Sequence, residues 1–367
     1  DITVIGIDDY TMNRFEKLPS EWKRDVYAKL LDSLHSENYG PAVVGFDILF
    51  TGQKDPETDK LFVDACEKYG DVVTGVYFEY RSEVSGVGNI DEQRVISSVA
   101  YPFEALKDVT YQGFTDSSTN IDGDLTSFQN VRNAIKRFMG IKDDVYARTL
   151  IPYIDHDGGR MESLALAAYR VYCEKQGIPF DVSGLYGLYE KYNNIFFTYS
   201  TEPYKGRTYP FNYYSLADVI EGDYSAYVDG HIVLVGAYAG GLSDDFLTPA
   251  DHSGKMYGVD IHGNSIEAIA QGKLQVDTFR NRADKPDILI CLVYALLTAG
   301  FVLFLYLIPQ KIEFALTLDK GKNSWTRHII TPLNVEVTLS VILILLNILA
   351  EVIFYRNGYY IRIVYFA

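Results

Sequence analysis

Cysteine is scarce in this sequence, with three among 367 residues. So few cysteines exclude a fold held by several disulfides, and their spacing matches no metal-ligand motif. Cys66 and Cys173 both lie in amphipathic helical patterns. Because free cysteine is among the most buried residue types, we expect both to be small core residues rather than a disulfide pair.

Basic residues are also few. The chain has 33 Lys and Arg against 49 Asp and Glu, which gives a formal net charge of −16 at pH 7. Nucleic-acid binding depends on Lys and Arg contacts to phosphates. The charge balance therefore predicts no nucleic-acid partner.

Familiar catalytic motifs are missing as well. The sequence contains no nucleophile elbow, no HExxH and no paired-carboxylate motif. A glycine-rich segment at 236–241 follows a predicted strand, but it lacks both GxGxxG and GxxxxGK[ST]. Asp244 and Asp245 follow closely and make an anion site there unfavourable. We therefore predict no catalytic residue and no cofactor in this chain.

Long uncharged runs are present near the end of the sequence. The first, Ile288 to Ile308, has the length of about 20 apolar residues that a membrane-spanning helix needs. We predict transmembrane helices at about 287–308 and 333–355, and a truncated third helix from about 359. The region 286–367 is therefore predicted to be embedded in the cell membrane.

The charges between the first two runs predict the orientation. Lys311, Lys320, Lys322 and Arg327 lie there, and positively charged loops stay in the cytoplasm. We therefore expect the acidic domain of residues 1–285 to be extracytoplasmic. Because the sequence starts without Met and ends inside an apolar run, we also expect a preceding anchor or signal segment and a following part.

The region 1–285 shows apolar strand patterns that alternate with helical ones. Near-continuous apolar segments at 2–7, 43–46 and 232–235 predict buried strands. The intervening helical patterns predict an α/β fold: a mixed, mainly parallel sheet with helices on both faces. The polar stretch 115–143 is predicted to be a loop-rich insertion.

Acidic residues follow three of these predicted strands. They are Asp8 with Asp9, Asp47, and Asp244 with Asp245. Ligands of open α/β sheets bind at the carboxyl ends of strands, and converging carboxylates there suit a hard cation or an amine. The alternative is that each acid caps a helix or bonds loop amides. His262 and Asn264, at a predicted helix start, complete the ligand-binding candidates, and a metal ion stays an open question.

Tyrosine is abundant, with 30 residues, but these are spread along the whole sequence. That distribution predicts ordinary core and surface use rather than an aromatic cage.

Several segments resemble the CHASE type-2 domain, a sensor associated with bacterial cyclases and histidine kinases. HIVLVGAYAGGLSDDFLTP and YGVDIHGNSIEAIAQGK are similar to its end, and IGIDDYTMNRFEKLPSEWKRDVYAKLLDSL to its beginning. VVGFDILF, YARTLIPYIDHDGGRMESLALAAYR and FNYYSLADVIEG resemble parts between them. The family pattern is matched by Gly241, Leu242, Asp244, Phe246, Thr248, Pro249, Gly258, Val259, Ile261, His262 and Asn264. The insertion at 115–143 is longer than is usual, and Gly263 replaces a usual alanine.

The resemblance implies an extracytoplasmic sensor of a small molecule or an envelope ligand. It also implies a cytoplasmic output module outside this chain, either a kinase or, favoured, a nucleotide cyclase, and a homodimer. Two alternatives stay open. One is a membrane-anchored metal-dependent hydrolase in which Asp8, Asp47 and Asp244 bridge the metal. The other is an envelope structural protein that has no ligand.

Overall fold

The computed structural model describes residues 1–85, 91–115, 147, 149–192, 195–206, 208–242, 244–277 and 359–360. The chain divides into two compact units. One comprises Asp1–Tyr189 with Ile195–Leu274, and the other comprises Glu190–Asn194 with Gln275–Ala367. The first unit contains the main sheet and every candidate ligand-binding residue.

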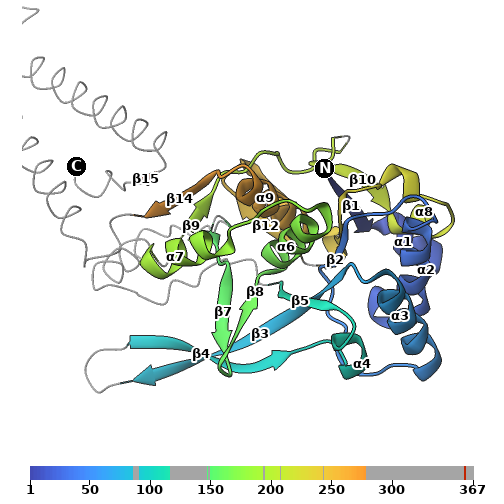
Figure 1. Cartoon of the computed structure of the whole chain (residues 1–367), viewed down its shortest axis with the longest axis horizontal. Coiled ribbons are helices and arrows are strands. Elements are labelled where there is room, and N and C mark those ends of the chain that lie inside the picture. Colours follow the sequence, from blue (N-terminus) through green and yellow to red (C-terminus); the bar gives the residue numbers. More distant parts are fainter. Residues whose placement is uncertain are drawn as a thin grey trace, which may run out of the picture. The chain divides into compact units, whose positions relative to one another are not determined.

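The main sheet has seven strands in the order β10-β1-β11-β2-β3-β4, and β5 also pairs with β3. Every pairing is parallel except that of β3 with β4. The mainly parallel, mixed sheet of the prediction is therefore confirmed (Figure 1). The strands are β1 (Ile2–Ile7), β2 (Val43–Phe46), β3 (Val72–Ser85), β4 (Asp91–Ala100), β5 (Tyr111–Phe114), β10 (Asn212–Ser215) and β11 (Ile232–Ala237).

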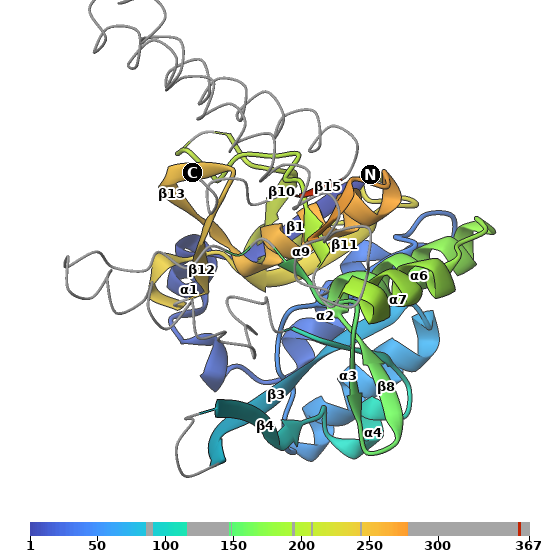
Figure 2. The ribbon, with the colours of Figure 1, turned by 90° about the vertical axis from the view of Figure 1, so that its left-hand side faces the viewer.

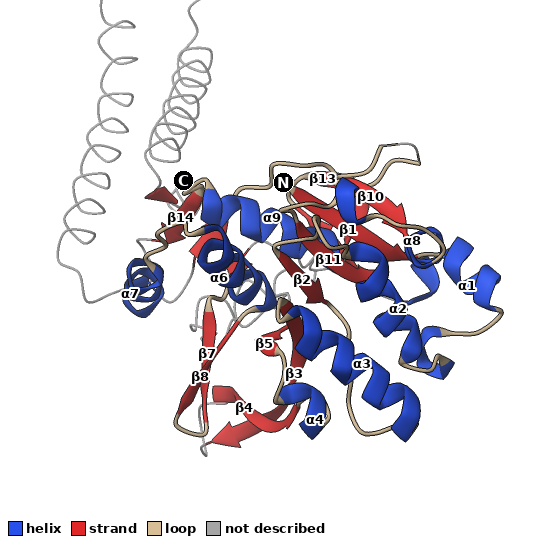
Figure 3. Ribbon diagram, turned by 45° about the vertical axis from the view of Figure 1, so that its right-hand side comes forward, coloured by secondary structure: helices blue, strands red, loops and turns tan. Residues whose placement is uncertain are grey.

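Helices cover both faces of this sheet, as the sequence pattern predicts. Helices α6 and α9 lie on one side of the central strands, and α2 and α3 lie on the other (Figure 3). The helices are α1 (Asp9–Phe15), α2 (Asp25–Leu34), α3 (Pro56–Tyr69), α4 (Glu104–Lys107), α6 (Leu164–Gln176), α7 (Val182–Tyr192), α8 (Leu216–Ile220) and α9 (Gly258–Ala270). Short 3₁₀ turns occur at Pro19–Glu21, Ser225–Tyr227 and Gly240–Leu242.

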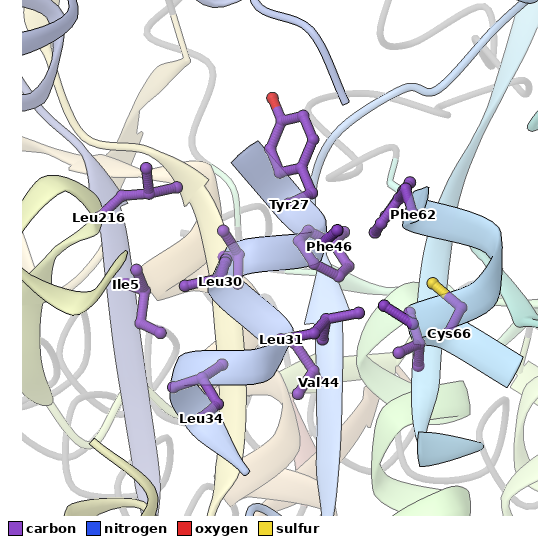
Figure 4. Packing of buried hydrophobic residues seen from close by; sticks show 14 of the residues in the cluster. Ile5, Tyr27, Leu30, Leu31, Leu34, Val44, Phe46, Phe62, Cys66 and Leu216 are labelled. Atoms are coloured by element: carbon purple, nitrogen blue, oxygen red, sulfur yellow. The ribbon is translucent and has the colours of Figure 1, made fainter. Parts of the chain in front are cut away.

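Each face of the sheet has its own hydrophobic core, because successive side chains of a strand point to opposite faces. In β1, Ile5 packs against α2 and α8, whereas Val4 packs toward α6 and α9. Figure 4 shows the first core, where Leu30, Leu31 and Phe46 lie between helix and strand. The predicted strands at 2–7, 43–46 and 232–235 are thus central and buried.

Local sequence explains where α3 begins and ends. The carboxylate of Asp55 accepts a hydrogen bond from the backbone N–H of Thr58, and Pro56 occupies the first turn. Gly70 ends the helix at φ 62°, a left-handed conformation that glycine adopts at little cost. Cys66 on this helix and Cys173 on α6 are both buried and free, as expected.

Smaller strand pairs surround the sheet. The turn at Asp157-Gly158 joins β7 (Tyr153–His156) to β8 (Gly159–Glu162) in an antiparallel hairpin. Others pair β6 (Thr149–Leu150) with β9 (Ile195–Phe197), and β12 (Asp245–Thr248) with β13 (Asp251–Tyr257). In the second unit, β14 (Leu274–Asp277) pairs with β15 (Tyr359–Tyr360).

Strand β3 extends beyond its run of apolar residues. β3 continues from Val72 to Ser85 and forms an antiparallel ribbon with β4 (Figure 2). The register of this pairing shifts between Glu79 and Tyr80 of β3. The apolar residues that indicate a strand in the sequence end at Phe78. Beyond that point, cross-strand pairing extends the strand through polar residues.

Some predictions concern residues outside the described part of the chain. The insertion at 115–143 lies there except for Thr115, and so do the predicted transmembrane helices at 287–308 and 333–355. Among the described residues, no helix combines the length and the hydrophobicity that a bilayer crossing requires.

The helix–sheet core should dominate stability. Leu31→Ala removes a side chain that is 0% exposed between α2 and the sheet, so we expect a loss of roughly 2–5 kcal/mol in unfolding free energy. Leu61→Ala is the matched control, because Leu61 on α3 is 53% exposed. Thermal unfolding of the full chain in detergent measures both. Equal destabilisation by the two variants would contradict this assignment of the core.

Candidate functional site

The candidate site begins where β2 ends. Asp47 follows the last residue of β2, and its backbone N–H donates to the carbonyl of Val235 at 2.8 Å. Phe46 pairs with Val235 and with Thr74, and the next residue on each neighbouring strand is a glycine, Gly236 or Gly75. Asp47 is therefore the only one of three adjacent positions that has a side chain.

Gly236 allows α9 to lie close to the sheet. A Cβ atom at this position would be 2.9 Å from the Cβ of Val259 and 3.2 Å from the Cβ of Asp47. Real Cβ atoms do not approach each other so closely, because cores are packed to van der Waals contact. The missing side chain thus places the first turn of α9 directly beside Asp47.

One turn further along α9, His262 faces Asp47. Its Nε2 atom lies 3.8 Å from Oδ1 of Asp47, and the two side chains are only 6% and 10% exposed. This separation is too long for a hydrogen bond. Nε2 of His262 is buried and has no hydrogen-bond partner in the described structure.

Burial also sets the protonation of His262. It lowers the pKa of His262 to about 4, although the nearby Asp244 carboxylate and a backbone hydrogen bond with Thr115 act in the opposite direction. The imidazole is therefore neutral at pH 7, and its unpartnered Nε2 can take part in a hydrogen bond with a ligand.

Asp244 brings a second carboxylate to the same place. Its carbonyl accepts from the N–H of Gly258 at 3.0 Å. A Cβ atom at Gly258 would lie 2.7 Å from the Asp244 carboxylate, so this glycine too permits a close approach. Burial, together with the charge of Asp47, raises the pKa of Asp244 to about 7, and burial alone raises the pKa of Asp47 to about 7.

Asp47, Asp244 and His262 thus form one buried cluster, which we name the acid–histidine cluster. Near neutral pH, both carboxyl groups are close to their midpoint of titration while the imidazole is uncharged. Such a cluster gains free energy when it takes up a proton or a cation. Of the sequence-predicted candidates, these three are brought together.

Asp8 and Asp9 are placed differently. The Asp8 carboxylate caps α1 by accepting from the N–H of Thr11 at 2.8 Å, and it also accepts from the hydroxyls of Tyr213 and Ser215. Asp9 is exposed in the first turn of α1. The helix-capping alternative therefore describes Asp8, and no described contact joins it to the acid–histidine cluster.

Asp245 and Asn264 have structural partners. Asp245 forms an ion pair of 3.0 Å with Lys255 across β12 and β13. Asn264 is fully buried, and its side-chain oxygen accepts from the backbone N–H groups of Ser200 and Thr201. Its amide donates to the carbonyl of Asp260 at 2.9 Å. Asn264 thus fastens the segment at 200–201 to α9.

The metal-bridged hydrolase hypothesis finds no support in this geometry. Among the described residues, no group of three or more His, Cys, Asp or Glu side chains is arranged to hold a metal ion. A hydrolase of that class would need its carboxylates to converge on one ion. Asp8 instead bonds to Thr11, Tyr213 and Ser215.

Sequence reasoning missed Asp260 and the tyrosines around it. Asp260 is 1% exposed and accepts from the Tyr238 hydroxyl at 2.9 Å, while its Oδ1 has no partner in the described structure. Tyr238 packs against Tyr213 and Tyr257 at ring distances of 4.7 and 4.2 Å. The sequence signal that could have identified Asp260 was an acidic residue inside a predicted helix, α9, that is otherwise apolar on most sides.

A model of the CHASE2 domain matches residues 1–302, which is most of the chain. The chain belongs to the CHASE2 family. This match confirms the resemblance seen in the sequence motifs. CHASE2 domains are sensory extracellular domains, which is consistent with a sensor role and an extracytoplasmic location. Comparison with curated proteins and with solved structures finds no match.

The acid–histidine cluster makes the stability of this CHASE2 domain depend on pH. An unfolded Asp titrates near 3.8, but Asp47 and Asp244 titrate near 7 in the fold. The folded state then holds these protons more tightly, so the unfolding free energy falls as the pH rises from about 4 to about 7. His262 acts oppositely between about pH 4 and 6.5, because there the unfolded chain binds the proton.

Asp47→Asn removes one of the two opposing acids. We expect this variant to gain stability relative to the unmodified protein between pH 5 and pH 8, by on the order of 1–3 kcal/mol. Melting temperatures at both pH values measure it. Asp64→Asn, at a half-exposed site on α3, should show the same small effect at both pH values. A pH-independent difference for Asp47→Asn would rule out its titration near neutrality.

Proposed function

We propose that this CHASE2 domain is the extracytoplasmic ligand-sensing part of a bacterial membrane receptor. The receptor controls a cytoplasmic output module, a kinase or, favoured, a nucleotide cyclase. The observation that carries the proposal is the unpartnered Nε2 of buried His262, which faces the carboxylates of Asp47 and Asp244. Family membership supports the sensory role.

The energetic cost of this cluster supports a functional reading. Leaving a buried polar atom unpaired costs about 1–3 kcal/mol, and burying two like-charged carboxylates adds to that. A purely structural position could be filled by apolar residues at lower cost. Titratable groups with perturbed pKa values that gather at the carboxyl ends of strands are typical of functional sites.

The chemistry of the cluster favours a positively charged ligand. Two carboxylates and one neutral imidazole nitrogen supply acceptors and negative charge, and no described Lys or Arg contributes to the pKa shifts of these three groups. We propose that the ligand carries a protonated amine, whose N–H groups can donate hydrogen bonds. Its binding would replace the missing hydrogen bond of His262 and neutralise the two acids.

Helix α9 connects this cluster to the rest of the receptor. It ends at Ala270, β14 follows at Leu274, and the predicted transmembrane helix begins at about 287. Ligand binding that shifts α9 would change the balance between two states of the membrane helices. We further propose that the receptor acts as a homodimer, since such output modules usually work in pairs.

Asp47→Asn tests the sensing role. We expect the full-length receptor to lose its ligand response or to need at least about tenfold more ligand, because the variant removes one carboxylate that would pair with the cation. Output activity per folded receptor, measured in membranes, is the readout. Asp64→Asn should respond as the unmodified receptor does. A lowered melting temperature with unchanged signalling per folded molecule would make Asp47 structural.

Topology is tested separately. We expect a single cysteine introduced at position 90 to react with an impermeant reagent on intact cells, and one at position 320 to react only after lysis. The reason is the cluster of basic residues between the predicted membrane helices. Labelling of position 320 alone on intact cells would reverse the orientation and place the CHASE2 domain in the cytoplasm.

A further inference from the structure

A pocket lies at the other end of α9 from the acid–histidine cluster. Its volume is about 530 Å³, within the size range of small-ligand sites. Ile2 and Ile232, at the starts of β1 and β11, form its floor, and Ala270 at the end of α9 forms part of its wall. Asp47 follows the carboxyl end of β2, which is parallel to β11, and His262 lies near the start of α9, so the two sites are separate.

Aromatic rings form much of the pocket wall. Tyr169 and Tyr172 of α6 lie roughly parallel, with ring centroids 6.1 Å apart. Tyr209 is 38% exposed and lines the pocket together with Phe211. The Tyr209 ring stacks on both Tyr213 and Tyr204, at 3.9 and 4.7 Å, which fixes it in place, so the ring faces offered to a ligand are those of Tyr169 and Tyr172. Aromatic faces carry negative potential and attract cations.

The charges at the pocket also favour a cation. Glu267 of α9 lines it, and no Lys or Arg does. Asp1, another lining residue, also carries a carboxylate. Glu267 accepts a hydrogen bond from the Ser200 hydroxyl and so is held at the pocket edge.

The helix end adds a third contribution. Ala270 and Gln271 line the pocket at the carboxyl end of α9, where the helix dipole is negative. Helices α3 and α6 carry Lys68 and Lys175 in their last turns, but α9 has no basic residue there. The negative end of α9 is thus left without a cation of its own.

We propose that this pocket binds an organic cation of the amine class. The ammonium group lies against the tyrosine rings and Glu267, and its alkyl groups contact Ile2, Ile232 and Ile266. A hydrated metal ion would gain nothing from the aromatic walls, and an anion would be repelled by Glu267 and by the end of α9. This site is spatially separate from the acid–histidine cluster and goes beyond the role proposed for that cluster.

A pair of probes with the same shape tests the role of charge. Choline is cationic, and 3,3-dimethyl-1-butanol is its neutral counterpart. Calorimetric titration of the full chain in detergent should show choline binding at least about tenfold more tightly, as an aromatic and acidic site favours cations. Equal affinity for the two probes, or no choline binding at tens of millimolar, would overturn the proposal.

Variants locate the binding. Glu267→Gln and Tyr172→Leu should each weaken choline binding by about five- to tenfold, whereas Tyr172→Phe should keep it within about twofold because the ring remains. Glu67→Gln, at an exposed site on α3, should bind choline normally. Unchanged binding in Glu267→Gln, or an equal loss in Glu67→Gln, would place choline elsewhere. If Tyr172→Leu fails to fold, Glu267→Gln and the probe pair still decide.

Discussion

The close packing of α9 against β11 is the contact on which the rest of this CHASE2 domain depends. It exists because Gly236 has no side chain where Val259 approaches the strand. Gly6 of β1 pairs with Gly236, and there the ring of Tyr213 and the Cβ atom of Tyr238 fill the space that a Cβ atom at Gly6 would need. The sheet therefore meets its covering layer at near-backbone distance, and any side chain that remains at this level is forced into contact with α9. Asp47 is that side chain.

A helix held so closely cannot keep its polar residues in water. Asp260, His262, Asn264 and Ser265 are all at least nine-tenths buried on α9. Asn264 and Ser265 satisfy their hydrogen bonds within the helix or with the segment at 200–201. Asp260 and His262 each keep one unpaired atom. The packing that stabilises the fold thus also buries polar atoms of Asp260 and His262 without hydrogen-bond partners, and the unpaired atom of His262 distinguishes the candidate site.

The predictable parts of the fold are those in which a local pattern coincides with burial. β1, β2 and β11 are continuous apolar runs because both of their faces are covered. The ends of α3 could be read from Asp55, Pro56 and Gly70, since capping depends on adjacent residues. The ribbon of β3 and β4 was not readable beyond Phe78, because pairing between strands, not side-chain pattern, extends it.

The candidate site was also predictable only in part. Parallel topology brings strand ends together, so Asp47 and Asp244 could be foreseen as neighbours near His262. Asp8 could not be assigned, because its partners Tyr213 and Ser215 come from about 200 residues away. The group of tyrosines around Tyr238 could not be predicted for the same reason: residues 204, 209, 213, 238 and 257 come together only in the folded sheet.

Helix α9 has one further consequence. Its 13 residues form a rod of about 20 Å, with the acid–histidine cluster at the first turns and the aromatic pocket at the last. Two ligands that displace one rigid rod must influence each other's affinity by the same factor. Opposite displacements would make them antagonists, and a common displacement would make them co-agonists. A domain with both proposed sites would compare two chemical conditions before it reports either of them.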